Sequence, residues 1–211
     1  TRADVSARPA ERAELLAHAA EAHRRVGDLE QAQQLFSQSL QVWRSIGAVN
    51  RMSWCLWGIG STLRVAGRFD ESRRLFLSAL SLAKGAQEPR CAAWSFAELA
   101  EIDRIVGYRR RALAAHREAL EMFTVLKDTK GISWAQAGIG QILRVEDDLS
   151  GAQDAFRESQ RASEEYDDEV GVAWALRGRA EIAKVRNDLS IAEQLAELAR
   201  AAFARKGYPM G

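Results

Sequence analysis

The residues of this sequence that could do chemistry form two ladders with a step of 40 residues. Tryptophans stand at Trp54, Trp94, Trp134 and Trp174. A basic residue keeps the same step through Arg24, Arg64, Arg104, Arg144 and Lys184. Indole rings offer broad apolar faces with one N–H donor, and guanidinium groups can hold carboxylates or phosphates through two parallel hydrogen bonds. The chemistry that these ladders favour is therefore recognition.

Sequence patterns that mark catalysis or metal binding are missing. His18, His23 and His116 lack metal-site spacing such as His-Glu-x-x-His, and Cys55 and Cys91 form no Cys-x-x-Cys pair. There is no Gly-x-Ser-x-Gly elbow and no Gly-Lys dipeptide of a Walker loop. We therefore expect no enzyme activity, no cofactor and no metal.

Composition and charge indicate which broad class of protein this chain belongs to. The chain has 211 residues, of which 47% are apolar and 28% charged, so it can bury a core. Thirty basic residues against 29 acidic ones leave a net charge of +1, which excludes a polycation built for nucleic acid. No apolar run reaches the roughly 18 residues of a membrane span, and the two cysteines favour a reduced, cytoplasmic setting.

The spacing of apolar residues predicts a pair of helices in each 40-residue unit. Leu56, Ile59 and Leu63 share one helical face, and Gly67 then breaks the chain. The turn position repeats at Gly27, Gly67, Gly107, Asp147 and Asn187. The expected helices span 8–26, 29–46, 51–66, 69–84, 90–106, 109–127, 130–145, 149–165, 170–186 and 189–206.

Residue types at the expected helix margins agree with these boundaries. Asp28, Asp148 and Asp188 stand where an aspartate could cap the second helix of its unit. The prolines are expected at helix margins: Pro9 and Pro89 before first helices, and Pro209 after the last helix.

The unit resembles the tetratricopeptide repeat (TPR) in its longer, 40-residue form. The family's pattern contains large apolar residues, a Leu-Gly pair, a turn glycine, aromatics and small residues. The second unit matches it with Leu56, Ile59-Gly60, Leu63, Gly67, Phe69, Ser72, Phe76 and Ala79. The third unit departs from the pattern at Asp103, Arg109 and His116, and the fifth at Arg179, Ala183 and Ala196.

This resemblance implies an all-α fold, a right-handed α-solenoid of about five helix-turn-helix repeats. The repeats are expected at roughly 8–46, 50–86, 89–127, 129–166 and 169–206, within a single solenoid over residues 1–211. The two ends of the chain lead us to expect a fragment of a larger protein. Leu195, Leu198 and Phe203 could form an exposed apolar edge through which copies self-associate.

In proteins of this family, one side of each first helix lines a concave groove where ligands dock. The resemblance places in that groove Trp54, Trp57, Arg64, Trp94, Glu101, Arg104, Trp134, Gln141, Arg144, Trp174, Arg177 and Lys184. An alternative remains open, in which each tryptophan only packs against the neighbouring repeat. The pairs Glu21–Arg24, Glu101–Arg104 and Glu181–Lys184 have i, i+3 spacing and could likewise satisfy each other.

Arg64 and Arg144 differ from the other members of the basic ladder. Three residues before them stand Ser61 and Gln141, where the other units have glutamate. Because they lack this local acid, we expect these two arginines to be the ones free to grip an anionic ligand. Acids on other helices could still pair with them.

The leading functional hypothesis is a non-catalytic scaffold that binds a protein or peptide, with anionic groups, in the groove. A second hypothesis is the ligand-sensing or autoinhibitory region of a bacterial signal-transducing ATPase or transcription regulator, where similar arrays occur. A third is single-stranded nucleic acid stacked on the tryptophans, against which the near-zero net charge argues. No membrane partner is expected.

Overall fold

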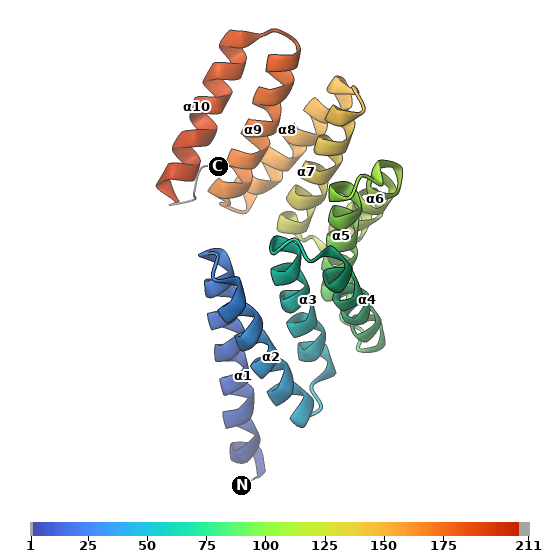
Figure 1. Ribbon diagram of the computed structural model, residues 1–211, viewed down its shortest axis with the longest axis vertical. Coiled ribbons are helices and arrows are strands. Elements are labelled where there is room, and N and C mark those ends of the chain that lie inside the picture. Colours follow the sequence, from blue (N-terminus) through green and yellow to red (C-terminus); the bar gives the residue numbers. More distant parts are fainter. Residues whose placement is uncertain (1, 207–211) are drawn as a thin grey trace. The chain divides into compact units, whose positions relative to one another are not determined.

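A computed structural model describes residues 2–206 of the chain, with side chains from Arg8 onward. The described residues form ten α-helices and no strand (Figure 1). They fall into two compact units, Thr1–Ile102 and Asp103–Gly211, with α5 running across the boundary. The all-α, helix-pair fold expected from the sequence is confirmed.

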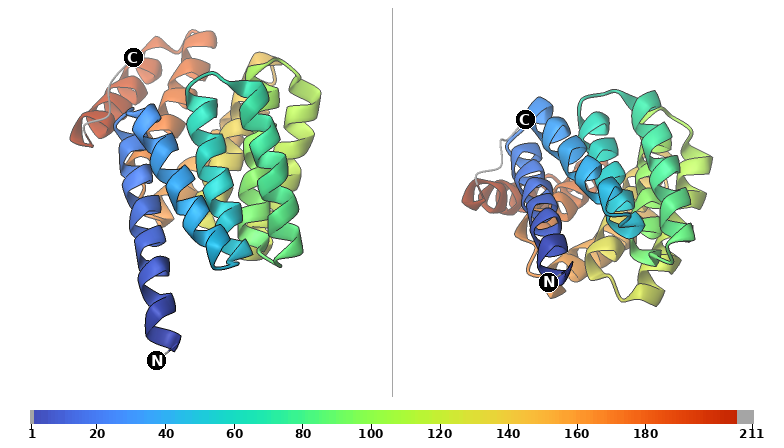
Figure 2. Two further views of the ribbon diagram at one scale, coloured as in Figure 1. Left: turned by 60° about the horizontal axis from the view of Figure 1, so that its bottom comes forward. Right: turned by 90° about the horizontal axis from the view of Figure 1, so that it is seen from below.

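The first unit contains four complete helices and most of a fifth. These are α1 (Arg2–Arg25), α2 (Leu29–Ser45), α3 (Val49–Val65), α4 (Phe69–Gly85) and α5 (Pro89–Ile105). α1 packs against α2, α2 against α3 and α3 against α4, and α1 also contacts α3. Phe76 of α4 packs against Leu99 and Ile102 of α5. The first turns of α1 project beyond its neighbours (Figure 2).

The second unit repeats the arrangement with five helices. These are α6 (Arg109–Leu126), α7 (Thr129–Val145), α8 (Leu149–Glu165), α9 (Glu169–Val185) and α10 (Leu189–Arg205). Neighbours in sequence again pack together, and α7 also contacts α9. Contacts between successive first helices, α1 with α3 and α7 with α9, bring residues 40 positions apart close together within each unit.

The core of each unit is a set of aromatic rings from second helices wedged between two first helices. Phe156 of α8 is fully buried between glycines of α7 and α9, where a Cβ atom on Gly140 or Gly178 would lie 3.0 or 2.5 Å from its ring. Phe36 of α2 likewise packs on Gly58 of α3. The small residues allow first helices to approach the ring closely, although glycine inside a helix lowers the stability of that helix relative to alanine.

The turns between helices follow the predicted ladder. Gly27, Gly67 and Gly107 have positive φ angles of 86°, 76° and 93°, and Asp147 and Asn187 adopt the same left-handed conformation at 65° and 64°. Glycine adopts this conformation without strain, and aspartate and asparagine tolerate it better than other residues.

Helix boundaries agree with the expected ones within two residues at every end except the first. The expectation that Pro9 precedes a helix is wrong, because α1 begins at Arg2 and continues through Pro9. A proline removes one backbone hydrogen bond, and here the turns on either side of it remain helical. Pro89 lies at the margin of a first helix, as expected, but as the first residue of α5 and not before it, and Pro209 lies outside the described residues.

The predicted caps are confirmed at two of three positions. Asp28 accepts a hydrogen bond from the Gln31 N–H at 3.3 Å, and Asp148 accepts one from the Gly151 N–H at 2.9 Å. Asp188 precedes α10 but makes no side-chain cap bond, so that expectation is wrong.

The expected apolar edge on α10 is only partly present. Leu198 is 57% exposed, whereas Leu195 packs against the local core and Phe203 is buried against Trp174. No helix within residues 2–206 is long and apolar enough to cross a membrane.

Candidate functional site

In each unit the ladder residues belong to the first helices, and we call these residues of a unit its first-helix face. In the first unit it is formed by α1, α3 and α5 up to Ile102, and in the second unit by the end of α5 together with α7 and α9. The predicted residues in the first unit are Trp54, Trp57, Arg64, Trp94 and Glu101, and those in the second are Arg104, Trp134, Gln141, Arg144, Trp174, Arg177 and Lys184.

Three of the predicted tryptophans form a row in the first unit. The rings of Trp54 and Trp57 meet edge to face with centroids 5.8 Å apart, and those of Trp57 and Trp94 do so at 6.1 Å. Trp54 and Trp57 are half-buried, while Trp94 is only 8% exposed. The indole N–H of Trp57 is buried without a hydrogen-bond partner. Edge-to-face packing fixes the rings as a rigid apolar surface.

A hollow of about 220 Å³ opens beside this row, between α1, α2 and α3. Its apolar lining includes Trp54 and Trp57, both predicted, together with Phe36, Trp43 and Cys55. Burial raises the pKa of the Cys55 thiol, which leaves this cysteine protonated and unreactive at neutral pH. A larger depression of about 520 Å³ follows α1 alone, along Arg12 and Leu15, and is less enclosed.

Charged residues surround the hollow in pairs. Glu14 of α1 binds Arg51 of α3 at 2.8 Å, and the Arg51 guanidinium also lies 5.8 Å from the Trp43 ring centre. Glu14 also lies 3.9 Å from His18. Sequence analysis missed Glu14, His18 and Arg51, although Glu14, His18 and Glu21 follow the i, i+4, i+7 spacing of one helical face.

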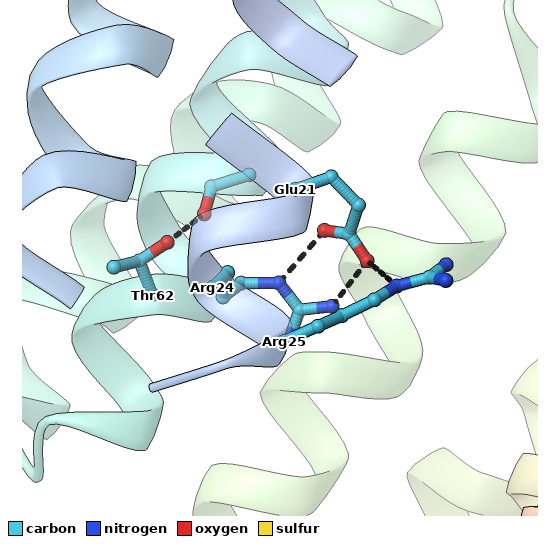
Figure 3. A network of polar contacts seen from close by, with 5 residues as sticks. Glu21, Arg24, Arg25 and Thr62 are labelled. Atoms are coloured by element: carbon cyan, nitrogen blue, oxygen red, sulfur yellow. Dashed lines mark hydrogen bonds and ion pairs between the residues drawn. The ribbon is translucent and has the colours of Figure 1, made fainter. Parts of the chain in front are cut away.

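The expected pairing of Glu21 with Arg24 is confirmed. The Glu21 carboxylate accepts hydrogen bonds from Nε and Nη2 of Arg24 at 2.8 and 2.7 Å, and from Nε of Arg25 at 3.0 Å (Figure 3). Burial alone would raise the pKa of Glu21, but the two guanidiniums hold it below its usual value. This carboxylate is therefore already saturated by its own helix.

Arg64 is not a free cation. Its Nε donates to Oε2 of Glu98 on α5 at 2.6 Å, and the Glu98 side chain is only 3% exposed. Burial raises the pKa of Glu98 in spite of this guanidinium. The expectation that Arg64 is available to an anion is therefore wrong, because the acid comes from the next first helix.

The sequence does contain a signal for Glu98, in the 40-residue step to which its position belongs. At the 40-residue step the equivalent positions are Gly58, Gly138 and Gly178, each of which faces a ring of the preceding second helix. A glutamate at a position that is glycine in three other repeats indicates that the two helices pack differently here. Here Phe76 packs against Leu99 and Ile102.

Arg144 is also paired, but less completely. Its Nη2 lies 3.2 Å from the Gln141 side-chain oxygen and 3.2 Å from Oε2 of Glu181 on α9. The other carboxylate oxygen of Glu181 lies 3.5 Å from Nε of Arg177. The expected partner of Glu181 was Lys184, so the observed pairing with Arg144 and Arg177 corrects that expectation.

The remaining predicted residues have mixed surroundings. Trp174 is 41% exposed, with the Phe203 ring 5.2 Å away and the Arg177 guanidinium 5.2 Å from its ring centre. Trp134, Glu101 and Arg104 are half-buried, and Lys184 is exposed. Their participation in binding stays a prediction.

The departures of the third 40-residue repeat from the family pattern are accommodated by polar and ring contacts. Asp103 is buried and binds Arg111 of α6 through both carboxylate oxygens, and Arg111 also lies 4.9 Å from the Tyr108 ring centre. His116 fills the aromatic position and is fully buried against Gly138. Within the described residues, no group of three or more potential metal ligands gathers at one place.

These features together define a helical-repeat protein of TPR-like fold with an aromatic first-helix face. No family model matches the chain, and no curated protein matches it. Solved structures do resemble it. BtubC (BKLC) from P. vanneervenii has a TM-score of 0.69 and 18% identity over 99% of this chain and 92% of that chain.

Two further structures show the same fold. The Rap conjugation gene regulator of the plasmid pLS20, in complex with the Phr* peptide, has a TM-score of 0.74 and 15% identity, covering 93% of this chain and 63% of that chain. The nearly identical TPR-like repeats assigned to a kinesin light chain of Podosopora anserina have a TM-score of 0.62 and 12% identity, covering 94% and 97%. At these identities the likeness defines the fold alone.

Proposed function

We propose that this chain is a non-catalytic scaffold that binds a peptide or protein segment on its first-helix face. The observation that carries the proposal is the hollow between α1, α2 and α3, with the tryptophan row beside it. Tryptophan is among the residues that contribute most to protein interfaces when partly buried in a rigid surround. The hollow offers such a surround.

The size of the hollow favours a side chain over a metabolite. Pockets for small molecules usually measure about 300–1,000 Å³, whereas this one holds about 220 Å³. That volume suits one or two apolar side chains of an extended or helical peptide. The charged groups at its edge are held in ion pairs with one another, so they offer no free acid or base for catalysis.

The fold comparison supports a peptide over other occupants. The Rap regulator, which shares this fold, was solved in complex with the Phr* peptide. The same likeness favours, as a second candidate, a regulatory array whose state changes when a peptide binds. Single-stranded nucleic acid is a poorer occupant, because Glu14 and Glu21 line the same hollow as the tryptophans.

Selection from a random dodecapeptide library against the whole chain would test the proposal. We expect selected peptides to bind wild-type protein and to lose at least about tenfold in affinity on Trp54→Ala, since a hot-spot tryptophan contributes about 2 kcal/mol or more. Tyr166→Ala is the matched control, because Tyr166 is an exposed aromatic residue at the end of α8 that does not line the hollow.

The proposal fails if the library yields no binder, or if binders respond to Tyr166→Ala and not to Trp54→Ala. Thermal unfolding of both variants checks that the comparison is made between folded proteins. A change in hydrodynamic radius on peptide binding would favour the regulatory candidate over a static scaffold.

A further inference from the structure

The hollow between α1, α2 and α3 has walls that are largely aromatic. Phe36 and Trp43 of α2 line it together with Trp54 and Trp57 of α3. The rings of Trp54 and Trp57 stand at 72° to each other, so they form two adjoining walls and not a flat stack. Because the face of an aromatic ring is electrically negative, rings that surround one space at steep angles can hold an organic cation.

One cation of the protein already lies against this aromatic lining. The Arg51 guanidinium is 5.8 Å from the Trp43 ring centre, within the roughly 6 Å over which a cation and a ring attract each other. The Arg51 side chain is also 51% exposed, so it lies at the open edge of the hollow. The remaining ring faces of the lining can therefore contact a cation that a bound ligand brings.

The acids that line the hollow already have arginine partners. Glu21 accepts hydrogen bonds from Arg24 and Arg25. Glu14 binds Arg51 at 2.8 Å. A primary ammonium group has three N–H donors, and it would lose hydrogen bonds to water without meeting an unoccupied carboxylate here. A quaternary ammonium group has no N–H to satisfy and presents methyl groups to the ring faces, so it is the cation that this lining suits.

We propose that the hollow binds the trimethylammonium group of a trimethylated lysine in the partner peptide. The inference rests on the proposed function and names the side chain that enters the hollow. The four-carbon stem of lysine is apolar and can lie along the tryptophan row, while the charged group reaches the rings. A volume of about 220 Å³ holds one such side chain and is small for a metabolite.

The test uses three synthetic peptides of the form acetyl-Ala-X-Ala-amide. Residue X is trimethyllysine, lysine, or the neutral analogue of trimethyllysine in which carbon replaces the quaternary nitrogen. Binding is followed on the ¹⁵N-labelled whole chain through the indole N–H signals of Trp43, Trp54 and Trp57. Because the neutral analogue has the same shape, its deficit in affinity measures the contribution of the charge. We expect the trimethyllysine peptide to bind about tenfold tighter than either of the others.

Substitutions of Trp54 separate a cation–ring contact from simple apolar burial. Trp54→Leu keeps an apolar wall but removes the ring face, so it should abolish the preference for trimethyllysine over the neutral analogue. Trp54→Phe keeps a ring with a weaker attraction for cations and should retain part of that preference. Tyr166→Leu is the matched control, because Tyr166 is an exposed aromatic residue at the end of α8 that does not line the hollow. Thermal unfolding of each variant checks that it is folded.

The inference is overturned if the lysine peptide or the neutral analogue binds as tightly as the trimethyllysine peptide, or if Trp54→Leu keeps the preference. Choline chloride tests the source of the cation, since choline binding as tightly as the peptide would overturn the assignment to a peptide side chain. If library peptides bind through Trp54 but the trimethyllysine peptide does not bind, the proposed function stands and this inference fails. If neither kind of peptide binds, the proposed function itself fails.

Discussion

The substitution Gly58→Ala should destabilise the first unit, although alanine is the better helix former. A Cβ atom at position 58 would lie 2.6 Å from Cε1 and Cζ of Phe36 and 2.9 Å from Cδ1. Real Cβ contacts with ring carbons are about 1 Å longer, so the ring would have to move by roughly that amount. Phe36 is only 6% exposed and packs with Ala20, Ile59 and Leu63.

The expected magnitude follows from two opposing effects. Replacing a mid-helix glycine by alanine gains about 1 kcal/mol in helix propensity. Forcing an extra methyl group into a packed core costs about 1–3 kcal/mol, and the upper half of that range applies because the atom contacted is a rigid ring. We expect a net loss of about 1–2 kcal/mol in the free energy of unfolding.

Gly85→Ala in α4 is the matched control. A Cβ atom there would meet nothing within 4 Å, so the same substitution should be neutral or stabilise by a few tenths of a kcal/mol. Urea unfolding followed by far-ultraviolet circular dichroism measures both variants against wild type. The packing argument is refuted if Gly58→Ala raises the midpoint as Gly85→Ala does, with an unchanged slope.

Two other predictions concern a helix cap and a buried acid. Asp148→Ala should lower the free energy of unfolding by about 1 kcal/mol, whereas Asp188→Ala should leave it almost unchanged, because of these two only Asp148 accepts a cap hydrogen bond. Equal losses for the two variants in urea unfolding would contradict this prediction. Burial raises the pKa of Glu98 in the folded protein above its value near 4.5 in the unfolded chain. The protonated carboxyl group therefore favours the folded state at low pH. This contribution to the free energy of unfolding is lost as the pH rises through the pKa of the folded protein. The unfolding free energy of wild type minus that of Glu98→Gln should therefore fall between pH 4 and pH 7, and a difference that rises would disprove the assigned shift.

The fold was predictable because its core rests on a few residue types at one spacing. Phe76 and Phe156 are fully buried, as the inner stripe of a second helix requires, and Gly60 and Gly140 meet them as close-packed neighbours. Tight turns at Gly67 and Asp147 have the left-handed conformation that their residue types favour. Each of these features depends on local sequence.

The candidate site was only partly predictable, because its charges pair between helices. Arg64 lacks an acid on its own helix, but Glu98 comes from α5 and lies 34 residues away in sequence. Spacing within one helix cannot report such a partner. Pro9 shows the same limit for the backbone, since a residue that usually ends a helix lies inside α1.

The buried pair of Glu98 and Arg64 also bears on how the chain finds its correct order of pairing. When repeats share one sequence pattern, a second helix can pack against the first helix of the wrong repeat, because its aromatic ring fits the glycine of either first helix. Glu98 makes the first helix α5 different from the first helices that carry glycine at this position. A chain slipped by one repeat would bury this carboxylate without a cation, which is strongly unfavourable. We therefore expect the junction of α3 with α5 to disfavour pairing that is shifted by one repeat.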